Sequence, residues 1–193
     1  MAHDTCDFLV IGSGLAGLSF ALHAARIGKV TVLTKAQVVD SNTNWAQGGI
    51  AAAVGESDDW SLHEEDTLVA GAGLCDREAV RFLVQRAPQA IEWLRGLGAR
   101  FDLDGSNALD LGREGGHSRH RIVHHADKTG WEVERAVSEA VRQHDSIQVV
   151  ENAFVTELHL HDGRCVGASA HIADLGMRTF GARAVMLATG GCG

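Results

Sequence analysis

The first part of the chain alternates between two short apolar runs and one longer helical stretch. Residues 7–11 form an apolar run suited to a buried parallel strand, and residues 30–34 form a second one. Between them, residues 15–28 are rich in alanine and leucine and end in glycine, which commonly closes a helix. Strand, helix and strand in this order predict a βαβ unit.

The middle of the chain returns to helical spacing. Residues 61–72 begin with Ser61 and Glu64, which match the capping-box pattern at the start of a helix. Residues 76–97 form a longer helical stretch, which Pro88 is expected to kink or split because proline removes a backbone donor. We interpret both helices as scaffold.

Two polar, glycine-containing segments lie on either side of these helices. Residues 41–54 and residues 101–127 show no convincing helical or strand period. They are predicted to be ordered loops, which in compact domains usually carry function. Apolar spacing resumes over residues 129–144 and predicts another helix.

The last third of the chain alternates in the manner of β-structure. The predicted strands cover residues 148–150, 154–160, 165–172 and 184–188, with a hairpin turn at Asp162-Gly163. Together with the βαβ unit, these strands place the chain in the α/β class, with a Rossmann-like parallel sheet.

Length, charge and cysteines narrow the class of protein. With 193 residues, 45% of them hydrophobic, the chain can bury one core, so one domain is the starting expectation. The formal net charge is -8, and no basic stripe is present to bind nucleic acid. Cys6, Cys75, Cys165 and Cys192 are widely spaced, as expected for reduced thiols of a cytoplasmic protein. Acidic residues precede the apolar stretch 8–25, so no targeting or membrane segment is predicted.

A glycine-rich turn lies between the first predicted strand and the first predicted helix, where the dinucleotide fingerprint occurs. Its glycines allow a tight turn, close approach of the backbone to a pyrophosphate, and close packing of helix on strand. The helix N-terminus supplies unpaired N–H groups. The candidate cofactor-binding residues are Gly12, Ser13, Gly14, Leu15, Ala16 and Gly17.

The acidic residue that usually binds the ribose at the end of the second strand is missing, and Lys35 stands there instead. A lysine is compatible with the 2′-phosphate of NADP or with another dinucleotide geometry, and it can equally be an ordinary solvated side chain. This departure argues against a plain NAD dehydrogenase.

The segment Ser41-Asn-Thr-Asn-Trp-Ala-Gln-Gly-Gly-Ile50 resembles the flavin-binding loop of the fumarate reductase, succinate dehydrogenase and L-aspartate oxidase superfamily. The resemblance implies that this loop runs along the isoalloxazine of FAD, and that Lys35 belongs to the superfamily's Ser/Thr-Lys pair. It adds the candidate cofactor-binding residues Asn42, Thr43, Asn44, Trp45, Ala46, Gln47, Gly48 and Gly49.

The residue at position 42 bears on how the flavin is held. Membrane-bound members of the superfamily carry a histidine there and bond it covalently to the flavin, whereas this chain carries Asn42. The resemblance therefore implies non-covalent FAD, with oxygen or fumarate rather than quinone as the electron acceptor.

A second match, Arg113-Glu-Gly-Gly-His-Ser118, resembles the form of a superfamily motif found in L-aspartate oxidases. Glu114 stands where succinate and fumarate enzymes usually carry an apolar aromatic residue. Aspartate differs from succinate by one ammonium group, which a carboxylate can select through a charge-assisted hydrogen bond. The resemblance implies that Glu114 binds this ammonium and that His117 helps to shape the pocket. The alternative for Glu114 is a solvent-exposed loop glutamate.

Four histidines, His117, His120, His124 and His125, fall within one short segment. Their spacing matches no zinc pattern, and no cysteine or paired carboxylate joins them, so we expect no metal site. His124 and His125 are expected to be structural histidines with satisfied hydrogen bonds.

Residues 184–191 match a second FAD motif of the superfamily, in which a strand followed by Ala-Thr-Gly-Gly returns beside the glycine-rich turn. This match adds Thr189 and Gly190 as cofactor-binding candidates. Val155 stands where the strand that enters the family's β-meander contacts adenine through its backbone, and a plain core valine is the alternative. The implied fold is a Rossmann-like FAD-binding domain with a parallel sheet plus a β-meander.

The resemblance spans the chain, but family members run for several hundred residues. Residues 1–193 are therefore interpreted as an incomplete N-terminal part of the FAD-binding domain, without the capping and C-terminal helical domains. The implied activity is oxidation of L-aspartate to iminoaspartate, the first step of bacterial NAD biosynthesis, with quinolinate synthase as a candidate partner. The general acid or base is expected outside this chain, which alone is expected to be inactive. Two alternatives are a soluble fumarate reductase-type flavoprotein and a catalytically silent FAD-binding fragment.

Overall fold

The computed structural model describes residues 3–191, and the chain divides into two compact units. The first unit comprises the residues up to Asn44 together with those from Glu134 onwards, and the second comprises Trp45–Val133. Each unit has its own sheet, so the two are described separately.

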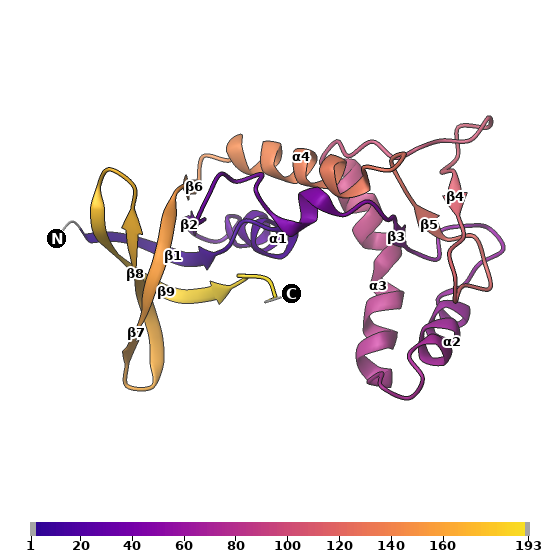
Figure 1. Ribbon diagram of the computed structural model, residues 1–193, viewed down its shortest axis with the longest axis horizontal. Coiled ribbons are helices and arrows are strands. Elements are labelled where there is room, and N and C mark those ends of the chain that lie inside the picture. The colour runs from indigo at the N-terminus through magenta and orange to yellow at the C-terminus, as the bar shows by residue number, and fades with distance from the viewer. Residues whose placement is uncertain (1–2, 192–193) are drawn as a thin grey trace. The chain divides into compact units, whose positions relative to one another are not determined.

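The first unit is built on a six-stranded sheet in the order β6-β2-β1-β9-β8-β7 (Figure 1). Strands β6, β2, β1 and β9 run parallel, whereas β9, β8 and β7 form an antiparallel meander. The strands are β1 His3–Ile11, β2 Val30–Leu33, β6 Ile147–Val150, β7 Ala153–His161, β8 Arg164–Ile172 and β9 Gly176–Leu187. The predicted α/β fold with a parallel sheet and a β-meander is confirmed.

The core of the first unit lies around the parallel strands. Leu9 and Val10 are both fully buried although they point to opposite faces of the sheet, which explains why β1 reads as a continuous apolar run. Helix α1 (Leu15–Ala24) packs against β1 and β2 and buries Leu18. Leu9 belongs to a buried cluster that includes Phe180 of β9, so the meander is part of the same core.

Strand β7 forms one edge of the six-stranded sheet and is joined to β8 by a tight turn. Asp162 and Gly163 have φ values of 50° and 74°, as a type I′ turn requires, so the predicted hairpin is confirmed. The register between the two strands shifts between Val155 and Glu157, which leaves Thr156 as the extra residue of a β-bulge. Strand β7 is therefore bent next to Val155, the residue that the sequence marked as a candidate adenine contact.

The second unit combines helices α2 (Trp60–Ala70) and α3 (Arg77–Gly96) with a small three-stranded sheet. The sheet has the order β3-β5-β4, with strands Ile50–Ala51, Ile122–Val123 and Leu111–Gly112. Two further helices cross the division between the units, the 3-10 helix Asn42–Trp45 and α4 (Thr129–Arg142). Both segments that were predicted to be loops thus contain short strands, because two-residue strands leave no periodic pattern to read.

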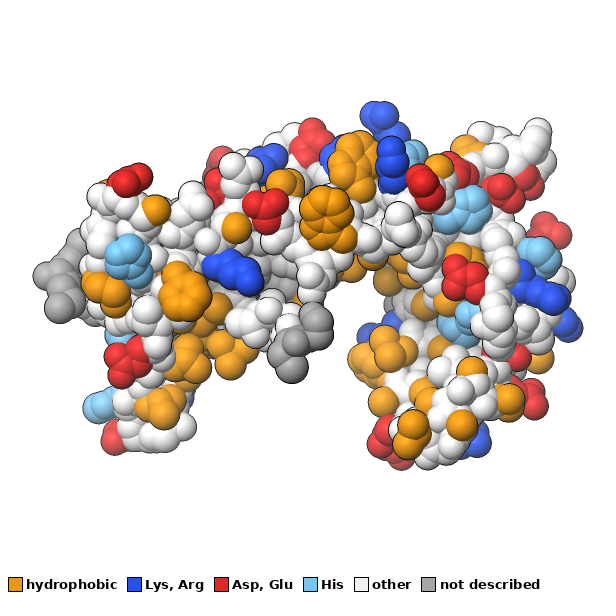
Figure 2. All heavy atoms as spheres, in the orientation of Figure 1, with side chains coloured by type: hydrophobic (Ala, Val, Ile, Leu, Met, Phe, Trp, Pro, Cys, Tyr) orange, Lys and Arg blue, Asp and Glu red, His pale blue; other side chains and the backbone are white. Residues whose placement is uncertain are grey.

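Hydrophobic side chains also reach the surface of the pair α2 and α3 (Figure 2). Phe82 and Leu83 on α3 and Val69 on α2 are exposed, and Leu74 in the connecting turn is 94% exposed. Exposed apolar side chains gathered in this way are typical of surfaces that other protein groups cover.

The start of α2 differs from the prediction. The helix begins at Trp60, and its N-cap is Asp59, whose Oδ1 accepts a hydrogen bond from the backbone N–H of Ser61 at 2.8 Å. The predicted capping box of Ser61 with Glu64 is therefore wrong, because an aspartate two residues earlier caps the helix and Glu64 binds arginines.

Two other helix predictions also need correction. Helix α3 continues through Pro88, so the predicted split is wrong. Its buried face, which includes Val84 and Ile91, holds both halves against the rest of the unit and outweighs the one backbone bond that proline removes. Helix α1 ends at Ala24 rather than at Gly28, because residues 25–28 form turns.

Within residues 3–191, each helix is either too short or too polar to cross a membrane. Cys6, Cys75 and Cys165 are free cysteines, and Cys192 lies outside the described residues.

Candidate functional site

The glycine-rich turn after β1 has a backbone shape that side chains would prevent. Gly12 has a φ of +113°, and a Cβ there would collide with the carbonyl oxygen of Ala188. A Cβ on Gly17 would collide with the carbonyl oxygen of Gly12, so this glycine lets α1 lie close to β1. Gly14 is the N-cap of α1, and as a glycine it has no side chain to cap the helix. A Cβ placed on Gly14 would be in ordinary contact with Thr43 Oγ1, at 3.7 Å. The turn presents the start of α1 as an anion-binding surface.

Ser13 contributes to this turn in a different way from the glycines. Its side chain is buried, and its hydroxyl lies 2.9 Å from Thr34 Oγ1 and 3.0 Å from the carbonyl oxygen of Val38. The hydroxyl therefore ties the turn to the end of β2. What Ser13 offers to a ligand is its backbone.

The second motif lies beside the first, as the sequence predicted. The backbone N–H of Ala188 donates to the carbonyl oxygen of Ile11 at 2.8 Å, and Gly190 follows with a φ of +79°. A Cβ placed on Gly190 would lie 4.0 Å from Asn42 Nδ2. Thr189 and Gly190 are exposed, so their backbone is accessible beside the glycine-rich turn.

The first residues of the predicted flavin loop pack on the same turn. Thr43 Oγ1 accepts a hydrogen bond from the backbone N–H of Leu15, the first residue of α1, at 3.2 Å. Ser41 precedes the 3-10 helix, and its hydroxyl donates to Glu134 Oε2 at 3.0 Å. Residues Asn42, Thr43 and Asn44 are thereby brought to the start of α1.

The two remaining candidates of the first unit are Lys35, just after β2, and Val155 on β7. Lys35 is exposed directly after the buried Thr34. The backbone N–H of Ala153, at the start of β7, donates to the carbonyl oxygen of Thr34 at 2.9 Å. Val155 is paired with Ala170 in the sheet and packs beside the buried cluster. Lys35 and Val155 thus come shortly after Thr34 and Ala153, two residues that are hydrogen-bonded to each other. Contact of Val155 with adenine stays a prediction.

The remaining residues of the predicted flavin loop, Trp45, Ala46, Gln47, Gly48 and Gly49, belong to the second unit. The first four are exposed, and Trp45 is 76% exposed. Two backbone contacts hold the segment: the carbonyl oxygen of Ala46 accepts from Gly130 N–H at 2.9 Å, and a Cβ on Gly49 would collide with Ile122. The loop is fixed by its backbone while its side chains face outward.

Glu114 lies beside this loop. A Cβ placed on Gly48 would lie 4.0 Å from Glu114 Oε1. Glu114 occupies a tight turn in which its carbonyl oxygen accepts from His117 N–H at 3.3 Å, and Gly116 has a φ of +85°. The carboxylate is exposed and has no hydrogen-bond or ion-pair partner among the described residues. It is therefore available to a cation.

Arg121, three residues after the motif that ends at Ser118, anchors this turn. It is fully buried, and its Nε and Nη2 donate to Asp58 at 2.8 and 2.9 Å, while Nη1 donates to Asp66 at 2.8 Å. Asp66 also accepts from the N–H and the hydroxyl of Ser118, at 2.7 and 2.8 Å. Burial alone would raise the pKa of Asp66, but the hydrogen bonds from Ser118 and Arg121 outweigh it and lower this pKa. The motif is thus fastened to α2 and the segment before it.

Two histidines complete this cluster. His117 Nδ1 lies 3.4 Å from Arg121 Nη1, and its ring centroid is 5.6 Å from that of His63. His63 is buried, and its Nδ1 has no hydrogen-bond partner. Burial, followed by the charge of Arg121, lowers the pKa of His63, so this ring is neutral at pH 7. The sequence carried no signal for His63, because it lies on an otherwise ordinary helix.

The other histidines of the segment bind the protein itself. His124 Nδ1 lies 3.0 Å from Asp102 Oδ2, and His125 stacks on Trp131 with ring centroids 6.5 Å apart. His120 Nδ1 lies 3.1 Å from the carbonyl oxygen of Leu111. The prediction that His124 and His125 have structural partners is confirmed.

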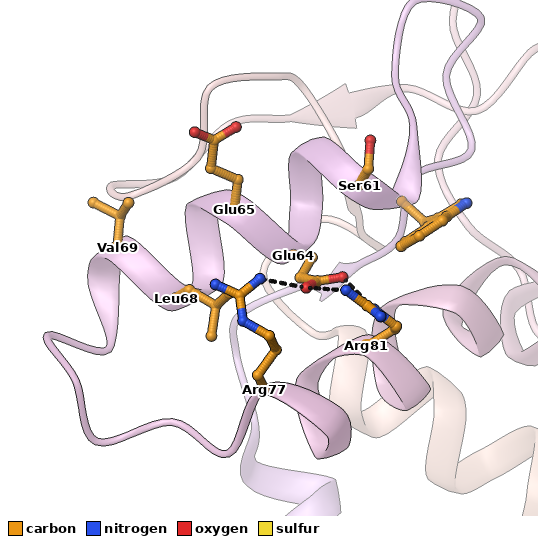
Figure 3. A pocket seen from close by; sticks show the side chains of 8 residues that line it. Ser61, Glu64, Glu65, Leu68, Val69, Arg77 and Arg81 are labelled. Atoms are coloured by element: carbon orange, nitrogen blue, oxygen red, sulfur yellow. Dashed lines mark hydrogen bonds and ion pairs between the residues drawn. The ribbon is translucent and has the colours of Figure 1, made fainter.

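A separate pocket between α2 and α3 is lined by the buried Glu64 and two exposed arginines that pair with it. Glu64 lies between Arg77 and Arg81 (Figure 3), with distances of 3.0 and 2.9 Å. The hydrogen bond from Arg81 lowers the pKa of Glu64. Because both arginines come from α3 and Glu64 comes from α2, this pair joins the two helices.

The geometry of the first unit agrees with what comparison with known proteins shows. Residues 7–193 match the model of the FAD binding domain family. The chain belongs to this family. Its FAD-binding domain fits the cofactor, because Gly12 and Gly17 give the turn a shape that a Cβ would prevent and the start of α1 has no side-chain cap.

The relatives of this FAD-binding domain are mostly longer proteins. It is 48% identical to an L-aspartate oxidase of Streptomyces coelicolor and 45% identical to one of Yersinia pestis, over 97% and 96% of the chain. These matches cover 33% and 37% of the two relatives, so the chain spans about a third of the length of the curated relatives it matches.

Solved structures confirm the fold of this FAD-binding domain. The Mycobacterium smegmatis Sdh1 complex matches it with a TM-score of 0.93 and 33% identity, over 100% of this chain and 35% of that one. Quinol fumarate reductase of E. coli matches with a TM-score of 0.94 and 29% identity, over 100% of this chain and 34% of that one.

Proposed function

We propose that the protein containing this FAD-binding domain oxidises L-aspartate to iminoaspartate. The observation that carries the proposal is the position of Glu114, whose unpartnered carboxylate lies beside Gly48 of the predicted flavin loop. An ammonium group bound there would gain a charge-assisted hydrogen bond, which a dicarboxylate without the amine cannot make. The names of relatives such as the L-aspartate oxidase of Streptomyces coelicolor support the same substrate.

Residues of both units have defined roles in this proposal. The backbone of Gly14 and the start of α1 would hold the pyrophosphate of FAD. Bound FAD supplies the acceptor for the hydride that leaves the substrate Cα. Glu114 would orient the substrate through its ammonium, and Arg121 would fix the turn that carries Glu114 through Asp66 and Ser118.

The FAD is proposed to be bound without a covalent link. Asn42 carries an amide rather than the imidazole that forms the flavin bond in the superfamily's membrane-bound members, and an amide nitrogen is not nucleophilic. Its Nδ2 lies close to Gly190, beside the glycine-rich turn. Denaturing the protein is expected to release all of the flavin into solution.

Further parts of the proposal concern the electron acceptor and the cellular role. Oxygen or fumarate would take the electrons, iminoaspartate would pass to quinolinate synthase, and the reaction would begin NAD biosynthesis in the cytoplasm. The free cysteines Cys6, Cys75 and Cys165 support a reducing compartment. The chain alone is proposed to lack the group that moves protons, because its relatives are about three times as long.

Fumarate reduction without aspartate oxidation is the second candidate function. The observation that favours it is the match to quinol fumarate reductase of E. coli, which covers the whole chain with a TM-score of 0.94. Glu114 separates the candidates, since fumarate has no cation for this carboxylate to bind. A flavin-binding fragment without catalysis is the third candidate, and loss of absorbance on adding aspartate would exclude it.

The experiment compares the unsubstituted protein with Glu114→Gln under anaerobic conditions. L-aspartate is expected to bleach the flavin of the unsubstituted protein. The substitution is expected to raise KM for L-aspartate about 10- to 100-fold, the cost of one charge-assisted hydrogen bond, with little change in fumarate reduction. Glu56→Gln, an exposed glutamate of the same unit, is the control and is expected to leave both activities unchanged. Turnover of fumarate with a reduced dye, without bleaching by aspartate, would contradict the proposal.

A further inference from the structure

His117 lies on the same tight turn as Glu114, and the proposed function does not yet use its side chain. The turn is closed by the backbone hydrogen bond from His117 N–H to the carbonyl oxygen of Glu114, at 3.3 Å. The first and fourth residues of such a turn have Cα atoms within about 7 Å of each other. The two side chains are therefore close enough for one small dicarboxylate to contact both.

The charged group behind this turn is Arg121, which cannot contact a ligand itself. Its side chain is fully buried. Nε and Nη2 donate to Asp58, and Nη1 donates to Asp66. The same Nη1 lies 3.4 Å from Nδ1 of the half-buried His117. The imidazole of His117 thus lies between the buried guanidinium group and the surface of the turn.

The contact with Arg121 decides which nitrogen of His117 carries the proton. A guanidinium group has N–H donors and no acceptor, so Nδ1 of His117 has to accept. A proton on Nδ1 would face the N–H of Arg121. The hydrogen-bond partners therefore assign the proton of the neutral ring to Nε2. The two nitrogens lie on different sides of the ring, so Nε2–H is directed away from Arg121.

Nε2 of His117 is free to donate to a ligand. It has no hydrogen-bond partner within residues 3–191, and it is not one of the buried polar atoms that lack a partner, so it has accessible surface. The ring is held by Arg121 and by the ring of His63, whose centroid is 5.6 Å away. Asp66 fixes the next residue by accepting from Ser118 N–H at 2.7 Å. A donor that is already held in place loses little freedom when a ligand binds.

We propose that His117 is a further substrate-binding residue, whose Nε2–H donates to a carboxylate of the substrate while Glu114 binds the ammonium group. The hydrogen bond from Arg121 polarises the imidazole and strengthens Nε2–H as a donor. His117 then recognises any dicarboxylate, and Glu114 selects the one that carries an amine. The inference rests on the proposed function, because that proposal places the substrate at the turn of Glu114.

The first test measures the dissociation constant of succinate in the full-length flavoprotein, from the change in flavin absorbance. Succinate has both carboxylates of aspartate and lacks the ammonium group. His117→Leu is expected to weaken succinate binding about 10- to 100-fold, the cost of one hydrogen bond to a charged group. Glu114→Gln is not expected to weaken it. Unchanged succinate affinity in His117→Leu, or no succinate binding by the unsubstituted protein, overturns the inference.

Two amide variants test the position of the donor. His117→Gln places an amide nitrogen close to the position of Nε2, whereas the shorter side chain of His117→Asn ends near the position of Nδ1. The first variant is expected to keep most of the succinate affinity, and the second is expected to lose as much as His117→Leu. A ring that only supports the fold would be replaced equally badly by both amides. Equal succinate affinities in the two variants therefore overturn the donor role.

His120→Leu is the matched control. His120 is an exposed histidine of the same segment, and its Nδ1 faces the carbonyl oxygen of Leu111. The substitution is expected to leave succinate affinity unchanged. Equal weakening in His120→Leu and His117→Leu would reveal a general effect of the segment and would overturn the specific role of His117.

A measurement without a variant covers the case in which the substituted proteins do not fold. Nitrogen NMR of the protein with isotope-labelled histidine distinguishes the two neutral tautomers of each ring. Succinate is expected to shift the Nε2 signal of a histidine that carries its proton on Nε2. If no such histidine signal moves when succinate binds, the inference is overturned.

The substrate assay separates this inference from the proposed function. His117→Leu is expected to raise KM for L-aspartate by about the factor that it costs in succinate binding, whereas Glu114→Gln acts on L-aspartate alone. If L-aspartate does not bleach the flavin but succinate binding depends on His117, the proposed function falls and the dicarboxylate site stands. If L-aspartate bleaches the flavin and succinate binds to His117→Leu normally, only the role of His117 falls.

Discussion

Gly12 and Gly17 shape the first unit because they have no side chain, whereas Arg121 shapes the second with the largest fully buried side chain in the described chain. In the first unit the ligand-facing groups are backbone N–H groups at the start of α1. In the second unit the turn that carries Glu114, the candidate substrate-binding residue, is held by Asp66, which accepts from the Ser118 N–H and pairs with Arg121. One site depends on local chain geometry and the other on contacts between distant residues.

This difference has an energetic consequence. A backbone cradle is sensitive to added volume, since Gly12 and Gly17 admit no Cβ. An ion-pair cluster is sensitive to the removal of one partner, because the other charge is then buried alone. The following substitutions test whether added volume disrupts the first unit and whether loss of a charged partner disrupts the second.

Arg121→Ala is expected to have the largest effect. It leaves Asp58 buried without a counter-charge and should lower the free energy of unfolding by about 3–5 kcal/mol, as measured by urea denaturation. Arg95→Ala removes an exposed pair with Glu92 and is the matched control, with an expected loss below about 0.5 kcal/mol. Similar losses in the two variants would show that burial does not strengthen the dependence on Arg121.

Gly12→Ala is expected to come next. The new Cβ collides with the backbone at Ala188, and the φ of +113° is unfavourable for alanine. Overpacking of this kind costs about 1–3 kcal/mol, and we expect FAD binding to be lost as well. The measurements are urea denaturation and flavin fluorescence. Gly98→Ala, at a φ of +89° with nothing within 4 Å, should lose stability without losing FAD. Retention of FAD by Gly12→Ala would show that the backbone cradle tolerates added volume.

The stability of the protein without cofactor should depend on pH through Glu134. Burial raises its pKa from 4.5 to about 7 on folding, so its contribution to stability is fully present below pH 4.5. Between pH 4.5 and 7 the folded state holds a proton that the unfolded state has lost, and stability falls by at most about 1.4 kcal/mol per pH unit. Denaturation of Glu134→Gln should show a shallower fall over this window. Identical slopes would mean that Glu134 ionises normally.

The smallest effect is expected at the β7–β8 turn. Gly163→Ala places a side chain at a φ of +74°, with open space around it. The conformational strain alone should cost about 1 kcal/mol. Thermal unfolding measures this cost, and FAD affinity should be unchanged because β9 separates the β7–β8 hairpin from β1, which leads into the cradle. A change in FAD affinity would show that the meander influences the cofactor site.

The features that the sequence predicted correctly are those with a local cause. The βαβ unit, the glycine turn, the Asp162-Gly163 hairpin and the return of residues 188–190 beside Gly12 each follow from a short pattern with one geometric solution. The position of Glu114 beside Gly48 was not predicted, although the resemblance assigned Glu114 to the substrate and Gly48 to the flavin.

The features that the sequence did not predict depend on residues far apart in the chain. Arg121 pairs with an aspartate 63 positions earlier, and no spacing rule links them. His63 and Glu134 look like ordinary polar positions of amphipathic helices until burial is known. The error at Pro88 has the same origin, because tertiary packing carried α3 through the proline. The error at α2 is local, because Asp59 rather than Ser61 caps the helix.

The bulge at Thr156 has a consequence for how the protein behaves at high concentration. Strand β7 is a sheet edge with exposed Phe154 and Leu160, a combination that favours self-association through strand pairing. The extra residue interrupts the regular row of unpaired N–H and C=O groups and increases the local twist. A second chain therefore meets an irregular template along β7. Deleting Thr156 would restore the regular spacing, and with it a route to edge-to-edge aggregation.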